Sequence, residues 1–182
     1  KDILEAVMPA IEQARAAIKN SDVSALRSLL AEHPALANER STDNDRTLLH
    51  TLADYPGHRL HQIEMAKLLI QAGADPNARF QHPENVDVRE TPLHWAASNN
   101  DEDLARLLLD AGADIDADGG VIENGTPLWD ATIFGCINSA RLLIEAGAAC
   151  NLMTAAAAGD LERVEDFFDD AGEPLPGAGA LP

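Results

Sequence analysis

The stretch that decides the fold is residues 91–116, which read TPLHWAASNNDEDLARLLLDAGADID. It starts with a threonine that can cap a helix and a proline that suits the first helical position. Leu104, Leu107 and Leu108 then follow at the spacing of a helix with one buried face. Gly112 supplies the left-handed residue at which such a helix ends. The stretch therefore predicts two short helices joined by a tight turn.

The same pattern recurs on both sides of this stretch. Residues 47–53 read TLLHTLA and residues 126–131 read TPLWDA, and each is followed by a helical segment and the motif AGA. A helix–turn–helix unit repeated with a period in the low to mid thirties is the signature of a solenoid. The wording TPLH, AA, LLL and AGAD resembles the ankyrin repeat, over residues from about 10 to 168.

The resemblance implies an all-α ankyrin-repeat solenoid of about five helix–turn–helix units, three of them clear and the two terminal ones divergent caps. We expect a single domain over residues 1–170, followed by a Gly- and Pro-rich segment, 171–182, that forms a flexible tail or linker. The expected units are 3–40, 47–79, 91–117, 126–150 and 152–170.

Apolar periodicity also predicts individual helices outside the central stretch. Pro9 lies within the first of them and either kinks it or marks its true first turn. Asp22 is expected to cap the next helix. The expected helices are 3–19, 23–32, 62–71, 137–145 and 161–168.

Departures from the repeat pattern indicate where the chain is specialised. The spacing from the repeat threonine to the helix-ending glycine is 21 in both later units (91 to 112 and 126 to 147). It is 26 in the unit that begins at Thr47. The five added residues fall in segment 55–61. The loops after Gly73 and Gly112, which the ankyrin pattern makes into hairpin fingers, are longer than that pattern has, whereas the finger after Gly147 is missing. The last unit is therefore expected to be a cap with an acidic outer face.

Composition limits the partners and the location of the chain. Thirty-one acidic against 13 basic residues give a net charge of −18, so nucleic acid and anionic membrane surfaces are poor partners. The chain has neither a secretory pattern nor an apolar run of the ~20 residues that span a membrane. Cys136 and Cys150 are expected to be reduced thiols, which favours a cytoplasmic protein.

The ankyrin resemblance implies a concave groove lined by the first helix of each unit, with the fingers beside it. The residue after the motif histidine and the residue three positions further on would line this groove. They make it an acidic groove centred on Trp95, with Asp54 and Asp130 from the flanking repeats on either side. We interpret Trp95 as a groove contact, and a core position is the alternative. The expected partner-binding residues are Thr51, Asp54, Tyr55, Trp95, Ser98, Asp130, Ile133, Phe80 and Ile122.

These features favour a protein- or peptide-binding module whose partner is basic or amphipathic, and they leave its oligomeric state open. The alternative is a small-molecule pocket closed by the fingers, with or without enzymatic activity, in which Asp130 or Asp54 would be the general base. We expect no cofactor and no metal, since His58 and His61 with Asp54 lack a further fixed ligand. The resemblance gives His50 and His94 structural hydrogen bonds between repeats.

Overall fold

The computed structural model describes residues 8–41, 45–54, 58–82 and 84–179. These residues form ten α helices and one 3-10 helix and no strand, so the predicted all-α repeat solenoid is confirmed. The elements in chain order are α2 (Ala10–Lys19), α3 (Val23–Glu32), η1 (Pro34–Ala37), α4 (Leu48–Ala53), α5 (Gln62–Gln71), α6 (Pro92–Ser98), α7 (Glu102–Asp110), α8 (Pro127–Ile133), α9 (Ile137–Glu145), α10 (Leu152–Ala158) and α11 (Leu161–Glu165).

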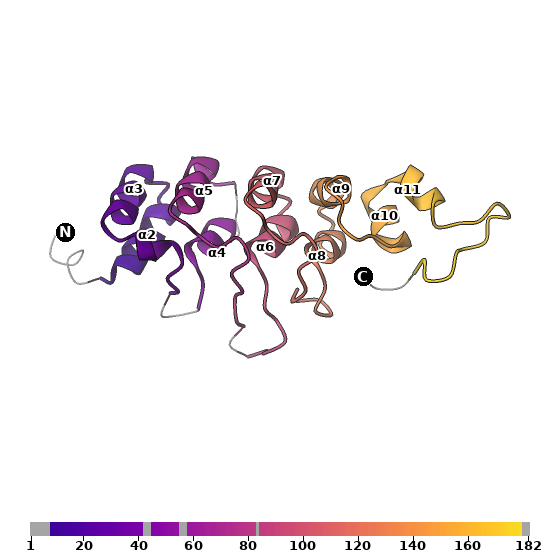
Figure 1. Ribbon diagram of the computed structural model, residues 1–182, viewed down its shortest axis with the longest axis horizontal. Coiled ribbons are helices and arrows are strands. Elements are labelled where there is room, and N and C mark those ends of the chain that lie inside the picture. The colour runs from indigo at the N-terminus through magenta and orange to yellow at the C-terminus, as the bar shows by residue number, and fades with distance from the viewer. Residues whose placement is uncertain (1–7, 42–44, 55–57, 83, 180–182) are drawn as a thin grey trace.

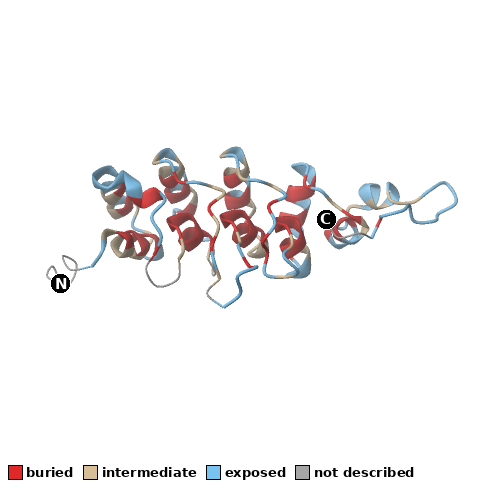
Figure 2. Cartoon of the chain, turned by 60° about the horizontal axis from the view of Figure 1, so that its bottom comes forward, coloured by how far each residue is buried: buried red, intermediate tan, exposed pale blue. Residues whose placement is uncertain are grey.

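The helices lie in two rows that run along the molecule. Figure 1 shows the first helix of each unit in one row, which consists of α2, α4, α6, α8 and α10. The second helices, α3, α5, α7, α9 and α11, form the other row. Figure 2 shows the buried residues between the rows and the exposed residues on the outer faces. Leu93, Ala96 and Ala97 of α6 are all fully buried, and small side chains at such positions let neighbouring helix axes approach closely. The core is therefore one continuous layer that each repeat extends.

Side-chain caps fix where the helices begin. The hydroxyls of Thr47 and Thr126 accept from the backbone N–H three residues on, and Asn151 does the same for α10. The carboxylates of Asp22 and Asp101 cap second helices in the same manner, so the predicted role of Asp22 is confirmed.

The predicted helices 23–32, 62–71 and 137–145 have the same bounds in the structure. Pro9 stands at the N-cap of α2 and its carbonyl accepts from Glu12, so it marks the first turn, and residues 3–7 lie outside the described residues. The last helix ends at Glu165, three residues before the predicted end. There the bond from Phe168 N to the Glu165 carbonyl closes a tighter, three-residue turn.

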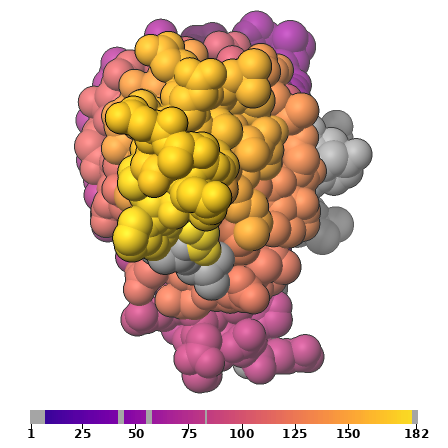
Figure 3. Space-filling view, turned by 90° about the vertical axis from the view of Figure 1, so that its right-hand side faces the viewer, coloured from indigo at the N-terminus to yellow at the C-terminus, as the bar shows by residue number. Residues whose placement is uncertain are grey.

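The described part of the C-terminal segment, residues 171–179, returns to the last repeat. Leu152 N donates to the Ala178 carbonyl at 2.8 Å, and Leu175 N donates to the Phe167 carbonyl at 2.8 Å. Ala178 is buried. Figure 3, viewed from the C-terminal end, shows this segment in yellow over the end of the repeat stack. These hydrogen bonds attach the segment that was predicted to be flexible to the last unit, and the segment covers part of that unit.

In two of the loops between units, an asparagine near the start of the loop links it to the end of the next unit. Asn77 Nδ2 donates to the Gly112 carbonyl at 2.9 Å, and its Oδ1 accepts from Asp114 N at 2.7 Å. Asn38 makes the same two bonds one repeat earlier, 2.7 Å to the Gly73 carbonyl and 2.7 Å from Asp75 N. An amide side chain can donate and accept at once, and both functions are used here.

The third position of this series holds a carboxylate instead. Asp116 accepts from Ala149 N at 2.9 Å, which matches one of the two asparagine bonds. A carboxylate cannot donate, so the bond to the carbonyl of Gly147, which corresponds to Gly112, is missing. The link to the unit at residues 126–150 is therefore weaker by one hydrogen bond.

We predict that Asp116→Asn stabilises the chain by about 1 kcal/mol, because it restores the missing donor. Asn77→Asp is the matched opposite change and should destabilise the chain by a similar amount. Urea unfolding followed by circular dichroism measures both. Equal midpoints for Asp116→Asn and the wild type would contradict the role given to these residues.

Candidate functional site

Two fingers project from the row of first helices and form one surface. The long finger (residues 74–90) is closed by the bond from Phe80 N to the Glu90 carbonyl at 2.8 Å, and the short finger (residues 113–125) by Gly120 N to the Gly125 carbonyl at 2.9 Å. The bond from Arg89 N to the Gly119 carbonyl, 2.9 Å long, joins the two fingers. Figure 1 shows both loops on the same side of the helix rows.

Histidines of the first helices hold the ends of these fingers. His50 Nε2 bonds the Glu90 carbonyl and His94 Nε2 bonds the Gly125 carbonyl, both at 3.1 Å, so the expected bonds between repeats are present. Because a carbonyl only accepts, Nε2 carries the proton in each ring and the imidazole is neutral. Burial lowers the pKa of His50 to about 3 and that of His94 to about 4. The two histidines thus have structural roles, as the sequence predicts.

Trp95, the residue expected at the centre of the groove, is mostly covered in the structure. It is 9% exposed and belongs to the core cluster, which is the alternative the sequence left open for it. Its ring meets those of His50 and Phe80 edge-on, with centroids 5.1 and 5.3 Å apart. Its Nε1 donates to Glu90 Oε2 at 3.0 Å. Only the remaining exposed edge of the indole is available to a partner.

Arg46 covers the face of Trp95. Its guanidinium carbon stands 4.5 Å from the Trp95 ring centroid and 5.6 Å from that of Phe80. The same guanidinium donates to Asp54 Oδ2 at 2.6 Å. Asp54 therefore holds Arg46 over the Trp95 ring, and the negative charge of Asp54 is already paired.

Glu90, which binds the Trp95 indole, and Asp130 are two carboxyl groups in a desolvated setting. Burial raises the pKa of Glu90. Asp130 is fully buried and neither of its oxygens has a hydrogen-bond partner of good geometry among the described residues. Burial, and then the nearby charge of Glu90, raise the pKa of Asp130 to about 8, an effect that the backbone N–H of Ile122 partly offsets. Asp130 is therefore protonated at neutral pH and presents no charged general base to the groove.

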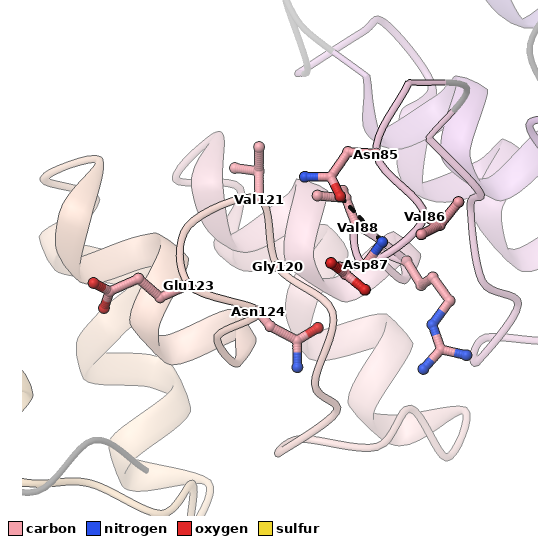
Figure 4. Close-up of a pocket in the computed structure, with 9 residues that line it drawn as sticks. Asn85, Val86, Asp87, Val88, Gly120, Val121, Glu123 and Asn124 are labelled. Atoms are coloured by element: carbon pink, nitrogen blue, oxygen red, sulfur yellow. Dashed lines mark hydrogen bonds between the residues drawn. The ribbon is translucent and has the colours of Figure 1, made fainter.

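Between the tips of the two fingers there is a hollow of about 560 Å³. Figure 4 shows that one wall comes from the long finger and the other from the short finger. Seven of the nine lining residues are exposed, and Val88 and Gly120 are buried. The lining residues are Asn85, Val86, Asp87, Val88, Arg89, Gly120, Val121, Glu123 and Asn124.

The other predicted contact residues differ in how accessible they are. Thr51 is buried and its hydroxyl donates to the Thr47 carbonyl, so its side chain is taken up by its own helix. Ser98 and Ile122 are half-buried, and Ile133 is 46% exposed. Tyr55 lies outside the described residues. Of the predicted set, Phe80 and Asp130 are placed beside the groove but beneath its surface.

Sequence reasoning missed two residues of this cluster, Arg46 and Glu90. Each stands directly before the capping threonine of its unit, one repeat apart, and they have opposite charges. Comparing that position between repeats could have found them. It also missed the exposed apolar turn at Phe134 and Ile137, which extends the exposed surface beyond Ile133.

Neither a metal-binding cluster nor a membrane-spanning helix is present in the described part of the chain. No three His, Cys, Asp or Glu side chains there are grouped so that they could hold a metal ion. His58 Nδ1 is 3.9 Å from Asp101 Oδ1, and His61 Nδ1 is 3.8 Å from Glu64 Oε2. None of the described helices has the length and apolar character needed to span a bilayer.

Profiles of known repeats match the middle of the chain. The profile for a single ankyrin repeat matches residues 44–80, and the profile for three ankyrin repeats matches residues 78–154. The two matches adjoin at the long finger and together cover the central units.

Three similar proteins are longer chains, and each matches this chain over part of its length. A palmitoyltransferase, Hip14, of Drosophila melanogaster is 42% identical over 86 residues, which are 47% of this chain and 12% of the relative. An E3 ubiquitin-protein ligase, KEG, of Arabidopsis thaliana is 35% identical over 95 residues, 52% of this chain and 5% of the relative. A putative ankyrin repeat protein of fowlpox virus is 31% identical over 137 residues, 74% of this chain and 28% of the relative. The chain thus spans well under a third of each relative.

The buried carboxyl group predicts how stability depends on pH. The folded chain keeps the Asp130 proton up to a pKa of about 8, whereas the unfolded chain releases it near the ordinary value of 3.8. Between these values the folded state binds more protons, so this group makes stability fall as pH rises. We expect the wild type to lose roughly 1 kcal/mol per pH unit relative to Asp130→Asn across that window. Urea unfolding of both proteins at the two ends of the window measures this, and a pH-independent difference between them would contradict it.

Proposed function

The chain belongs to the ankyrin-repeat family, and on that premise we propose that it is a protein- or peptide-binding module. Its contact surface is the groove around Trp95 together with the long and short fingers. Members of this family generally act as protein-interaction modules, and an extended repeat surface suits that task. The relatives support the same view, because their names give them unlike activities while they share this segment.

The observation that carries the proposal is the hollow between the fingertips. Two apolar side chains on its two walls are exposed, Val86 by 75% and Val121 by 45%. Exposed apolar groups inside a hollow with a polar rim are typical of a surface that a partner covers. Hydrogen bonds within and between the fingers hold the walls in place, so a partner meets a preformed surface.

The partner is proposed to be amphipathic and basic. Its apolar part would cover Val86 and Val121, and its basic part would meet Asp87 and Glu123 on the rim of the hollow. Arg89 also lines the hollow, so carboxylates outnumber cations there. The groove centre contributes less to this preference than expected, because Asp54 is paired with Arg46. The chain as a whole adds a field of net charge −18, which favours approach of a basic partner.

The small-molecule alternative is supported less well. The hollow of about 560 Å³ has the size of a ligand pocket, for which roughly 300–1,000 Å³ is usual. Its walls are mainly exposed loop residues, whereas such pockets enclose most of a ligand. An enzymatic role for Asp130 is not favoured either, because this side chain is fully buried. Both described cysteines are free thiols, which supports a cytoplasmic location as part of this proposal.

We predict that Val86→Asp/Val121→Asp lowers the affinity for the partner by at least tenfold, because it places two charges where apolar contact is expected. The immobilised chain would capture the partner from native lysate, and titration calorimetry with the isolated partner would give affinities. Leu60→Asp/Leu161→Asp is the matched control, since it adds the same charge at two exposed apolar positions outside the hollow. Equal loss in both double variants, or none in the first, would contradict the proposed surface.

A further inference from the structure

The side chain of Asp130 is the strongest unexplained feature of this surface. It is fully buried in α8, and neither carboxylate oxygen has a hydrogen-bond partner of good geometry among the described residues, the backbone N–H of Ile122 being the one donor that acts on it. Buried polar groups are nearly always bonded, and a buried carboxylate without a partner costs stability. No ion pair of the described residues includes Asp130. A group of this kind calls for a partner that the described chain does not supply.

The carboxylate faces the wall of the hollow at Gly120. A Cβ atom built on Gly120 would lie 2.8 Å from Asp130 Oδ1 and 2.9 Å from Oδ2. Both oxygens are thus presented to the same point of the backbone, and only the lack of a side chain there leaves them room. Gly120 itself lines the hollow between the fingertips. One backbone segment therefore separates the two orphaned oxygens from the hollow.

Glu90 places a second carboxyl group near the same point. Its charge acts on Asp130, and it follows Arg89, which lines the hollow. Two of the nearby cations are already engaged, since Arg46 bonds Asp54 and Arg79 bonds Asp118 at 2.9 Å, and Arg89 is the cation that remains in the lining. A cation bound behind Gly120 would therefore be attracted by Glu90 and would stabilise the ionised form of Asp130, whose proton would be released to solvent on binding.

We propose that the hollow receives an arginine side chain of the bound partner, whose guanidinium reaches past Gly120 to both oxygens of Asp130. The planar guanidinium presents paired N–H donors that match two carboxylate oxygens on one side, which a lysine ammonium does not. Val88 and Val121 flank the path and suit the methylene stem. The inference rests on the proposed function and names the partner's chemistry at its surface.

The short fingertip is the part that must shift to admit the guanidinium. Glu123 and Asn124 both hold left-handed backbone angles, with φ of 56° and 59°. Such angles are uncommon for residues other than glycine, so this turn is not in its most relaxed backbone conformation. A small movement of the tip would bring the buried oxygens of Asp130 into the hollow.

The test uses N-acetyl-arginine amide as the probe and the amide NMR signals of Gly120 and Ile122 as the readout. We expect saturable shifts of both signals with the arginine probe and none with its neutral analogue N-acetyl-citrulline amide, and weaker binding of N-acetyl-lysine amide. Asp130→Asn should weaken binding at least tenfold, which corresponds to about 1.4 kcal/mol. Gly120→Ala, which keeps both carboxyl groups but fills the space, should weaken it similarly.

Asp110→Asn is the control, because it removes the same charge from an exposed residue of α7 that lies outside the hollow. Unsaturable shifts, equal binding of citrulline, or an Asp130→Asn protein that binds as the wild type does would overturn the inference. So would an Asp110→Asn protein that loses as much affinity as Asp130→Asn. A chain that captures its partner through Val86 and Val121 but gives no arginine response refutes this inference alone. An arginine response with unaltered capture by the valine variant refutes only the proposed function.

Discussion

The hydrogen bond from a neutral histidine to the end of the next finger is the interaction on which the candidate surface depends. His50 and His94 each span two repeats, with Nε2 to carbonyl distances of 3.1 Å. The bond of His50 fixes Glu90, and Glu90 in turn accepts from the indole of Trp95. The bond of His94 fixes Gly125, which closes the short finger on Gly120. The same two side chains thus fix the position of both fingers and the position of Glu90 beside Trp95.

The fourth unit, at residues 126–150, shows what happens when this constraint is absent. Trp129 stands where the two preceding units have His50 and His94, and its Nε1 has no partner among the described residues. No finger follows at that point for it to hold. Its ring instead lies against Gly125, where a Cβ would come within 2.2 Å of Trp129 Cδ1. The change from histidine to tryptophan therefore coincides with the change from units that are followed by a finger to a unit that is not.

The repeat pattern predicted the fold and most helix bounds, because caps, glycine stops and apolar spacing are local signals. It also predicted the structural histidines and the positions of the long and short fingers, after Gly73 and Gly112. It did not predict the charge state of the groove. Whether Asp54 meets Arg46 and whether Asp130 meets any partner depends on side-chain geometry across repeats, and a formal count of charges made both of them anionic. The sequence placed the groove contact of Trp95 ahead of the core position for the same reason, since its cover comes from Arg46 and Phe80 of other segments.

The central claim is that a partner is held between the long and short fingers, over the groove. Amide hydrogen exchange of the chain, with and without its captured partner, tests it most directly, because every described backbone segment is read at once. The account predicts slower exchange on binding in residues 82–90 and 119–125, with little change in α3, α5, α7 and α9. Protection confined to those outer helices, with both fingers unaltered, would contradict it.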